Sequence, residues 1–130
     1  MKTAVRYYSK LGSTKTIADA IAKGAGVPAV SVTDEAELGE RVGLLFLGGA
    51  PYANIMSPEL RAYAERLTPE KVGKVVLFTT SNWSRRTVYA LRKLLKEKRI
   101  PVEDEYFYAH MLNIRNRTDA AQEFSARFGK

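Results

Sequence analysis

Hydrophobic residues follow two patterns along the chain: short apolar runs, and longer segments in which they recur every three or four positions. The short runs are typical of β-strands, and they occupy residues 3–8, 27–32, 42–47 and 75–80, while residues 101–110 show the alternation expected of a last strand. The recurring pattern is typical of amphipathic helices, and it covers residues 14–25, 58–67, 85–99 and 118–128. Residues 33–39 are a polar link between the second and third runs.

Local signals agree with these boundaries. Ser57 followed by Pro58 is typical of a helix start, with Ser as the N-cap and Pro at the first position. Gly26 suits the end of the helix before it. The run 42–47 is apolar throughout, as expected of a strand that is covered on both faces. Pro28 favours an edge position for the strand 27–32, because proline cannot donate a ladder hydrogen bond.

Strands and helices therefore alternate along the chain, with short connections and no internal repeat. This alternation predicts an α/β fold: a three-layer open sheet of about five parallel strands, with helices on both faces. The chain has 130 residues, the size of one domain, so residues 1–130 are expected to form a single domain.

Composition excludes several classes of protein. The chain has no Cys and one His, which removes disulfide scaffolds, Cys-based metal sites, Cys nucleophiles and His-rich metal centres. No apolar run approaches the ~18 residues that a membrane span needs, and the N-terminus lacks a signal-peptide core. We expect a cytoplasmic protein without a membrane segment and without a metal.

Ligands of such sheets lie beyond the carboxyl ends of the strands, so the segments that follow the strands carry the candidate chemistry. The first, residues 9–15, places hydroxyls, Gly12 and two lysines directly before a helix. A helix N-terminus binds phosphate through its free N–H groups, and the other interpretation is a capping turn with nothing bound. Neither G-x-x-x-x-G-K-[ST] nor G-x-G-x-x-G occurs, which argues against a nucleoside triphosphatase and against a dinucleotide site.

The other two segments carry aromatic residues. Residues 48–56 contain two glycines, a proline and Tyr52, and residues 81–84 contain Trp83, the only tryptophan. Taken singly, Tyr52 and Trp83 are each explained by packing of the ring against the loop backbone. Together, at the same sheet edge as a phosphate-type loop, they indicate a clamp for a planar ring that carries a phosphate.

These residues resemble the flavodoxin family. Its phosphate loop has a pattern close to [ST]-x-[ST]-G-x-T, which Ser9, Gly12 and Thr14 match, whereas Leu11 stands where the family has a hydroxyl. The segments 47–53 and 78–83 are similar to the family's second and third loops, which flank the isoalloxazine ring. The resemblance extends over nearly the whole chain and includes the order of its elements.

The resemblance implies the flavodoxin-like strand order 2-1-3-4-5, non-covalent FMN, and electron transfer by a carrier rather than by an FMN-dependent reductase. It implies no catalytic acid or base, and we expect His110 to be structural or exposed. The residues expected to hold FMN are Ser9, Lys10, Leu11, Gly12, Ser13 and Thr14; Pro51, Tyr52, Ala53 and Asn54; and Ser81, Asn82, Trp83 and Ser84.

The net charge of +7 departs from the acidic character that is typical of flavodoxins. Residues 85–99 hold seven basic residues and one acidic residue, and helical spacing places Arg85, Arg92, Lys96 and Arg99 on one stripe. The stripe is either a solvated helix face or a docking surface for an acidic redox partner. An alternative function is a flavodoxin-fold binding module that has lost FMN and binds an acidic partner through this helix. Nucleic acid is disfavoured because no recognised motif is present.

Overall fold

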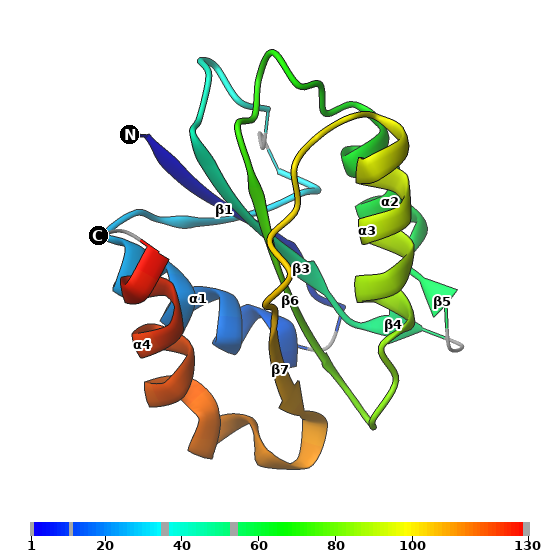
Figure 1. Ribbon diagram of the computed structural model, residues 1–130. Coiled ribbons are helices and arrows are strands. Elements are labelled where there is room, and N and C mark those ends of the chain that lie inside the picture. The colour runs from blue at the N-terminus through cyan, green and yellow to red at the C-terminus, as the bar shows by residue number, and fades with distance from the viewer. Residues whose placement is uncertain (1, 11, 35–36, 53–54, 129–130) are drawn as a thin grey trace.

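The computed structural model describes residues 2–10, 12–34, 37–52 and 55–128 of the chain. Its central sheet has five parallel strands in the order β2-β1-β3-β6-β7 (Figure 1). The strands are β1 (Thr3–Tyr8), β2 (Ala29–Ser31), β3 (Leu44–Gly49), β6 (Val75–Ser81) and β7 (Phe107–His110). A small antiparallel hairpin, β4 (Pro51–Tyr52) and β5 (Ile55–Met56), follows β3. Without the hairpin, this is the predicted order 2-1-3-4-5, and the α/β prediction is confirmed.

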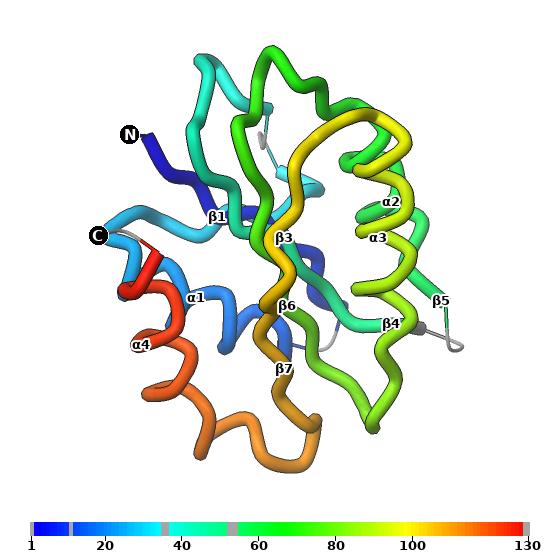
Figure 2. The backbone as a smooth tube through the Cα atoms, viewed as in Figure 1, coloured from blue at the N-terminus to red at the C-terminus, as the bar shows by residue number. Residues whose placement is uncertain are grey.

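Helices cover both faces of the sheet (Figures 1 and 2). On one face lie α1 (Ser13–Ala25) and α4 (Thr118–Phe128), and on the other lie α2 (Pro58–Glu65) and α3 (Arg86–Glu97). A 3₁₀-helix, η1 (Met111–Arg117), joins β7 to α4. The predicted three layers are therefore present. Within the described part of the chain, none of the helices combines the length and apolar character needed to cross a membrane.

The core has two parts, one on each face of the sheet. Every residue of β3 and β6 is buried, as the continuous apolar run predicts for β3, and this burial includes the hydroxyl residues Thr79, Thr80 and Ser81 of β6. Side chains alternate between the faces of a strand, so Leu45 and Leu47 pack in the cluster with α2 and α3, whereas Leu44 and Phe46 pack in the cluster with α1 and α4. This two-sided burial fixes the register of the strands whose ends carry the site.

The helix boundaries follow the local signals in the sequence. The Ser57 hydroxyl accepts a hydrogen bond from the Leu60 N–H at 3.3 Å, and Pro58 is the first residue of α2. Gly26 ends α1 in the left-handed region, with φ of 74°. Both caps are as predicted.

The last strand is shorter than the alternating pattern predicted. Only residues 107–110 form β7, and Val102 makes an isolated bridge with Val75. Side chains of α3 bind the segment before β7: the Arg92 guanidinium donates to the Asp104 carbonyl at 2.9 Å, and Arg85 Nε donates to the Tyr106 hydroxyl at 3.0 Å. Pro101 and Glu103 still exchange backbone hydrogen bonds with Val75, so the pairing with β6 is interrupted only between Glu103 and Phe107, where Arg85 and Arg92 bind the segment instead.

Other boundaries also differ from the prediction. β2 covers only 29–31 of the predicted 27–32, and β3 begins at Leu44 because Val42 forms an isolated bridge with Val72 instead. The hairpin after β3 and the 3₁₀-helix η1 were not predicted. Both lie at the carboxyl ends of strands, beside the candidate site.

Candidate functional site

The three candidate segments follow β1, β3 and β6, which are neighbours in the sheet. The ends of these strands are level, because Tyr8 pairs with Gly49 and Gly49 pairs with Thr79. The segments therefore leave the sheet at one edge, in the lower half of Figure 1. The predicted convergence is present in the backbone.

The first segment leaves the N-terminus of α1 open. Gly12 is the N-cap in the left-handed region, with φ of 97°, and no side chain caps the helix. The first turn of α1 holds no acidic residue. The Ser9 hydroxyl accepts a hydrogen bond from the Gly12 N–H at 2.9 Å and so shapes the loop. The first N–H groups of a helix have no intrahelical acceptor, so this end of α1 presents donors to an anion.

Two predicted site residues in this segment differ in their surroundings. The Thr14 hydroxyl lies 2.7 Å from the Thr80 hydroxyl, and Thr14 is only 1% exposed, so its side chain ties α1 to β6. Lys10 is exposed at the surface. Leu11 lies outside the described residues.

A wall of the site that sequence reasoning missed comes from η1. A hollow of about 710 Å³ lies between the start of α1 and this helix, and it is lined by Gly12, Ser13, Thr16 and residues 111–116. Among them, Asn113 has a non-helical backbone, and its carboxamide oxygen accepts a hydrogen bond from Asn116 at 2.7 Å. The signal was available in the sequence, because the segment after a fifth parallel strand reaches the same sheet edge as the others.

The third segment is a turn fixed by hydrogen bonds at both ends. The Ser81 hydroxyl donates to the Ser84 carbonyl at 2.5 Å. The Trp83 N–H donates to the Tyr108 hydroxyl at 2.7 Å, and that hydroxyl donates to the Ser81 carbonyl at 2.9 Å. Trp83 itself has φ of 71°, a region that residues other than glycine adopt rarely. Tyr108 therefore holds the turn in an uncommon backbone conformation.

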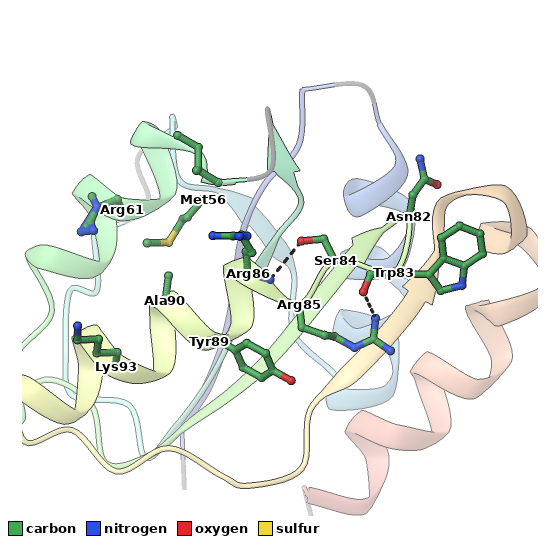
Figure 3. Close-up of a pocket in the computed structure, with 11 residues that line it drawn as sticks. Met56, Arg61, Asn82, Trp83, Ser84, Arg85, Arg86, Tyr89, Ala90 and Lys93 are labelled. Atoms are coloured by element: carbon green, nitrogen blue, oxygen red, sulfur yellow. Dashed lines mark hydrogen bonds between the residues drawn. The ribbon is translucent and has the colours of Figure 1, made fainter.

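Arg85 completes this arrangement. Its guanidinium lies 3.4 Å from the centroid of the Tyr108 ring and donates to the Trp83 carbonyl at 3.0 Å (Figure 3). The Trp83 indole is 76% exposed and meets the His110 ring edge-on, with the centroids 4.6 Å apart. The indole is therefore presented at the surface of the site rather than packed beneath the loop.

His110 has a structural contact at the end of β7. Its Nδ1 accepts a hydrogen bond from the Leu112 N–H at 3.1 Å, which begins η1. The imidazole thus connects η1 to the Trp83 side chain, in line with the structural role expected from the sequence.

The second segment is shaped by glycines. A Cβ at Gly48 would lie 2.3 Å from the Phe78 carbonyl oxygen, and a Cβ at Gly49 would lie 2.8 Å from the Leu60 side chain. Pro51 then opens the hairpin, in which it pairs with Met56. The Tyr52 side chain, Ala53 and Asn54 lie outside the described residues, so the aromatic pair of Tyr52 and Trp83 stays a prediction.

A second hollow lies on the α2 and α3 side of the turn. We call it the α2–α3 groove; it has a volume of about 950 Å³ (Figure 3). Besides the turn, it is lined by the apolar residues Ile55, Tyr89 and Ala90 and by the cations Arg61, Arg86 and Lys93. Ile55 is 59% exposed and Tyr89 is 57% exposed.

The structure divides the predicted basic stripe of α3. Arg85 and Arg92 are half-buried and bind the segment before β7, as described above. Lys96 and Arg99 are exposed. The sequence pattern could not separate the two pairs, because the segment that Arg85 and Arg92 bind was predicted as a strand.

Searches against protein-family models and against curated proteins find no match. Solved structures match over nearly the whole chain. A flavodoxin from the domain Archaea has a TM-score of 0.67 at 18% identity, covering 96% of this chain and 99% of its own. A flavodoxin from Fusobacterium nucleatum bound to flavin mononucleotide has a TM-score of 0.73 at 18% identity, covering 98% and 96%.

A third likeness is to a larger protein. The rubredoxin oxygen:oxidoreductase of Desulfovibrio gigas has a TM-score of 0.73 at 15% identity, covering 98% of this chain, which spans 35% of that protein. Together these likenesses establish that the chain has the flavodoxin-like fold.

Proposed function

We propose that this chain binds FMN non-covalently at the sheet edge formed by the ends of β1, β3 and β6 and acts in electron transfer. One observation carries the proposal: an open helix N-terminus and a fixed turn with an exposed indole lie at the same edge. The FMN-bound flavodoxin of the same fold supports it. We infer an electron carrier in preference to an FMN-dependent reductase, and we assign no residue as a catalytic acid or base, because electron transfer requires none.

At the phosphate end of the site, backbone N–H groups are the main groups suited to bind the FMN phosphate. The Thr14 hydroxyl is bonded to Thr80 and Leu11 has no hydroxyl, whereas the Ser9 hydroxyl only accepts a hydrogen bond from the Gly12 N–H and keeps its own proton to donate. The N–H groups of Ser13 and Thr14 at the start of α1 are therefore the principal donors, together with the positive end of the helix dipole. Ser13 and Lys10 add a hydroxyl and a positive charge from the loop.

At the other end of the site, the turn 81–84 and the β4–β5 hairpin would contact the flavin ring. When bound, FMN supplies the redox chemistry, and the protein supplies binding and orientation. Trp83 offers an aromatic surface whose backbone is held by Tyr108 and Arg85. We expect the backbone groups of Ala53, Asn54, Asn82 and Ser84 to face the edge of the ring, and Tyr52, which follows Pro51, to pack against the ring together with Trp83.

Electron transfer also requires a partner. We propose that the partner is an acidic redox protein that docks near residues 85–99, where seven basic residues meet one acidic residue. Complementary charge accelerates such encounters and makes them sensitive to salt. Arg85 and Arg92 are engaged within the chain, so the exposed cations of this segment carry the docking.

The experiment titrates FMN into the protein and follows the quenching of flavin fluorescence. Gly12→Ala and Gly26→Ala are a matched pair, because both glycines flank α1 in the left-handed region and neither Cβ would touch a neighbour. Each costs about 1 to 2 kcal/mol in backbone strain. We expect micromolar or tighter binding by the wild type and by Gly26→Ala, and about tenfold weaker binding by Gly12→Ala, a difference of about 1.4 kcal/mol.

Equal losses of FMN affinity in Gly12→Ala and Gly26→Ala would show that the loop before α1 does not bind the phosphate. No binding by the wild type at micromolar FMN would instead favour the second candidate, a binding module of the same fold without FMN. Leu11, the Thr14 hydroxyl bonded to Thr80 and the net charge of +7 are the observations that favour this candidate.

A further inference from the structure

Unpartnered cations surround the apolar part of the α2–α3 groove. Arg61 comes from α2, and Arg86 and Lys93 come from α3. Within the described part of the chain, no hydrogen bond or ion pair engages the charged groups of these three side chains, and none of the groove-lining residues there is acidic. The ion pairs that the described residues form lie elsewhere, such as those of Lys15 with Asp19 and Lys74 with Glu103.

The apolar surface of the groove is exposed in the same place. Tyr89 and Ile55 are two of the few large hydrophobic side chains of the described residues that face solvent. Tyr89 and Ala90 lie between Arg86 and Lys93 at helical spacings of three and four, which puts all four residues on one face of α3. Figure 3 shows Arg61 and Lys93 at the end of the groove away from Trp83, and Arg86 between that end and Trp83.

We propose that the α2–α3 groove is the docking site for an acidic segment of a partner protein that inserts an apolar side chain. The three cations select carboxylates, and the exposed ring of Tyr89 together with Ile55 provides contact area for the inserted side chain. Charge complementarity favours an acidic segment with one apolar side chain. A wholly apolar segment would leave Arg61, Arg86 and Lys93 without ionic partners at the edge of the groove.

The groove also shares the turn 81–84 with the proposed FMN site. A segment that lies in the groove would therefore rest beside the residues expected to hold the flavin ring. The identification of this partner as a redox protein rests on the proposed function, whereas the docking itself requires no FMN. This separation allows the two proposals to fail independently.

The test uses a fluorescein-labelled peptide, Glu-Glu-Glu-Phe-Glu-Glu-Glu, and measures its binding to the full chain by fluorescence anisotropy at low and at physiological salt. Two charge-reversal variants have the same net charge: Arg86→Glu/Lys93→Glu in the groove, and Lys23→Glu/Lys71→Glu at exposed positions outside it. We expect the groove variant to bind about tenfold or more weakly, since two attractive pairs become repulsive. We expect the control variant to lose much less.

A second pair of measurements tests the apolar part. Tyr89→Ser should weaken peptide binding, and replacing the phenylalanine of the peptide with serine should weaken it to a similar degree. If neither change matters, or if both charge-reversal variants lose affinity equally, the attraction is non-specific and the proposal is overturned. The absence of any binding at low salt would overturn it as well.

Two parallel measurements keep the outcomes distinct. A wild-type dimer in solution that Arg86→Glu/Lys93→Glu dissociates would assign the groove to a second copy of this chain and would overturn the partner proposal. Arg86→Glu/Lys93→Glu should bind FMN with the same affinity as the wild type. Peptide binding without FMN binding would refute the proposed function alone, and FMN binding without peptide binding would refute the docking alone.

Discussion

Trp83 combines an exposed indole with a left-handed backbone, and both features depend on residues distant in the sequence. Its N–H reaches the Tyr108 hydroxyl at 2.7 Å, and its carbonyl reaches Arg85 at 3.0 Å. A non-glycine residue in this region costs roughly 1 kcal/mol or more, and the hydrogen bonds offset that cost. The turn is thus fixed before any ligand arrives, which reduces the ordering cost of binding.

Tyr108→Phe tests this residue-scale account. The change removes the acceptor of the Trp83 N–H and the donor to the Ser81 carbonyl. We expect the free energy of unfolding to fall by about 1 to 2 kcal/mol, since each hydrogen bond contributes about 1 kcal/mol net. Urea unfolding measures it, with Tyr89→Phe as the control that loses an exposed hydroxyl. Equal stability of the two variants would mean that Tyr108 does not hold the turn.

The sequence places Trp83 in a loop at the sheet edge, but it does not reveal how the loop is held. Composition and order identify the turn, because the strand-like run 75–80 is followed by residues 81–84, which are polar apart from Trp83. The partner Tyr108 lies 25 positions further along the chain and meets Trp83 only through the pairing of β6 with β7. The Thr14 hydroxyl is a similar case, because its contact with Thr80 depends on the packing of α1 against the sheet.

At the scale of elements, α1 and α4 pack closely through Gly24. A Cβ at this position would lie 2.2 Å from both the Gln122 carbonyl oxygen and the Ser125 hydroxyl. The backbone of α4 would therefore have to move. Because η1 precedes α4 and lines the hollow at the start of α1, the spacing of these helices also sets the width of the phosphate end of the site.

Gly24→Ala is therefore expected to destabilise the protein, although alanine is the better helix former. Overpacking costs about 1 to 3 kcal/mol, which exceeds the gain of about 1 kcal/mol from helix propensity. Thermal unfolding compares this variant with Gly39→Ala, where a Cβ would meet nothing within 4 Å. A Gly24→Ala variant as stable as Gly39→Ala would show that the two helices can separate without cost.

The elements with unambiguous patterns were predicted well. β3 lies on a continuous apolar run, β6 begins with four apolar residues, and α2 has its Ser57 and Pro58 start. The hairpin and η1 were missed because strands of two residues and a 3₁₀ segment leave no periodicity to detect. Both lie beside the site. The position of the segment after β7 at this sheet edge could have been inferred from the strand order, but the local structure of η1 and of the hairpin could not.

At the scale of the whole molecule, the two-sided core makes stability sensitive to alkaline pH. Burial raises the pKa of the Tyr63 hydroxyl, although Arg6 nearby opposes the shift. The unfolded chain then loses this proton at a lower pH than the folded chain. The stability linked to Tyr63 is therefore fully present below a pH of about 10, the ordinary pKa of tyrosine, and is lost as the pH rises through the folded-state value.

Tyr63→Phe should accordingly flatten the fall of the melting temperature above pH 10. The variant has a lower stability at pH 7, because it loses the interaction with Arg6. Calorimetry from pH 7 to pH 11 measures both effects, with Tyr89→Phe as the exposed control. An unchanged alkaline slope in Tyr63→Phe would show that the hydroxyl ionises as easily in the folded chain as in the unfolded one.

The charge of +7 is also a property of the whole molecule, and its effect depends on where it is unpartnered. Arg85 and Arg92 bind backbone and aromatic groups within the chain, whereas Arg86 and Lys93 face the α2–α3 groove. The net charge follows directly from the sequence. Its division between structural and exposed cations required the position of the segment before β7.

The most direct test of the central claim is the amide NMR spectrum during an FMN titration. If three separate loops together bind the mononucleotide, saturable shifts should concentrate at the start of α1, at the β4–β5 hairpin and at the turn 81–84, with one affinity for all three. The amide of Gly26, at the other end of α1, should not move. Shifts confined to one loop or to the α2–α3 groove, or no saturable shifts, would contradict the account.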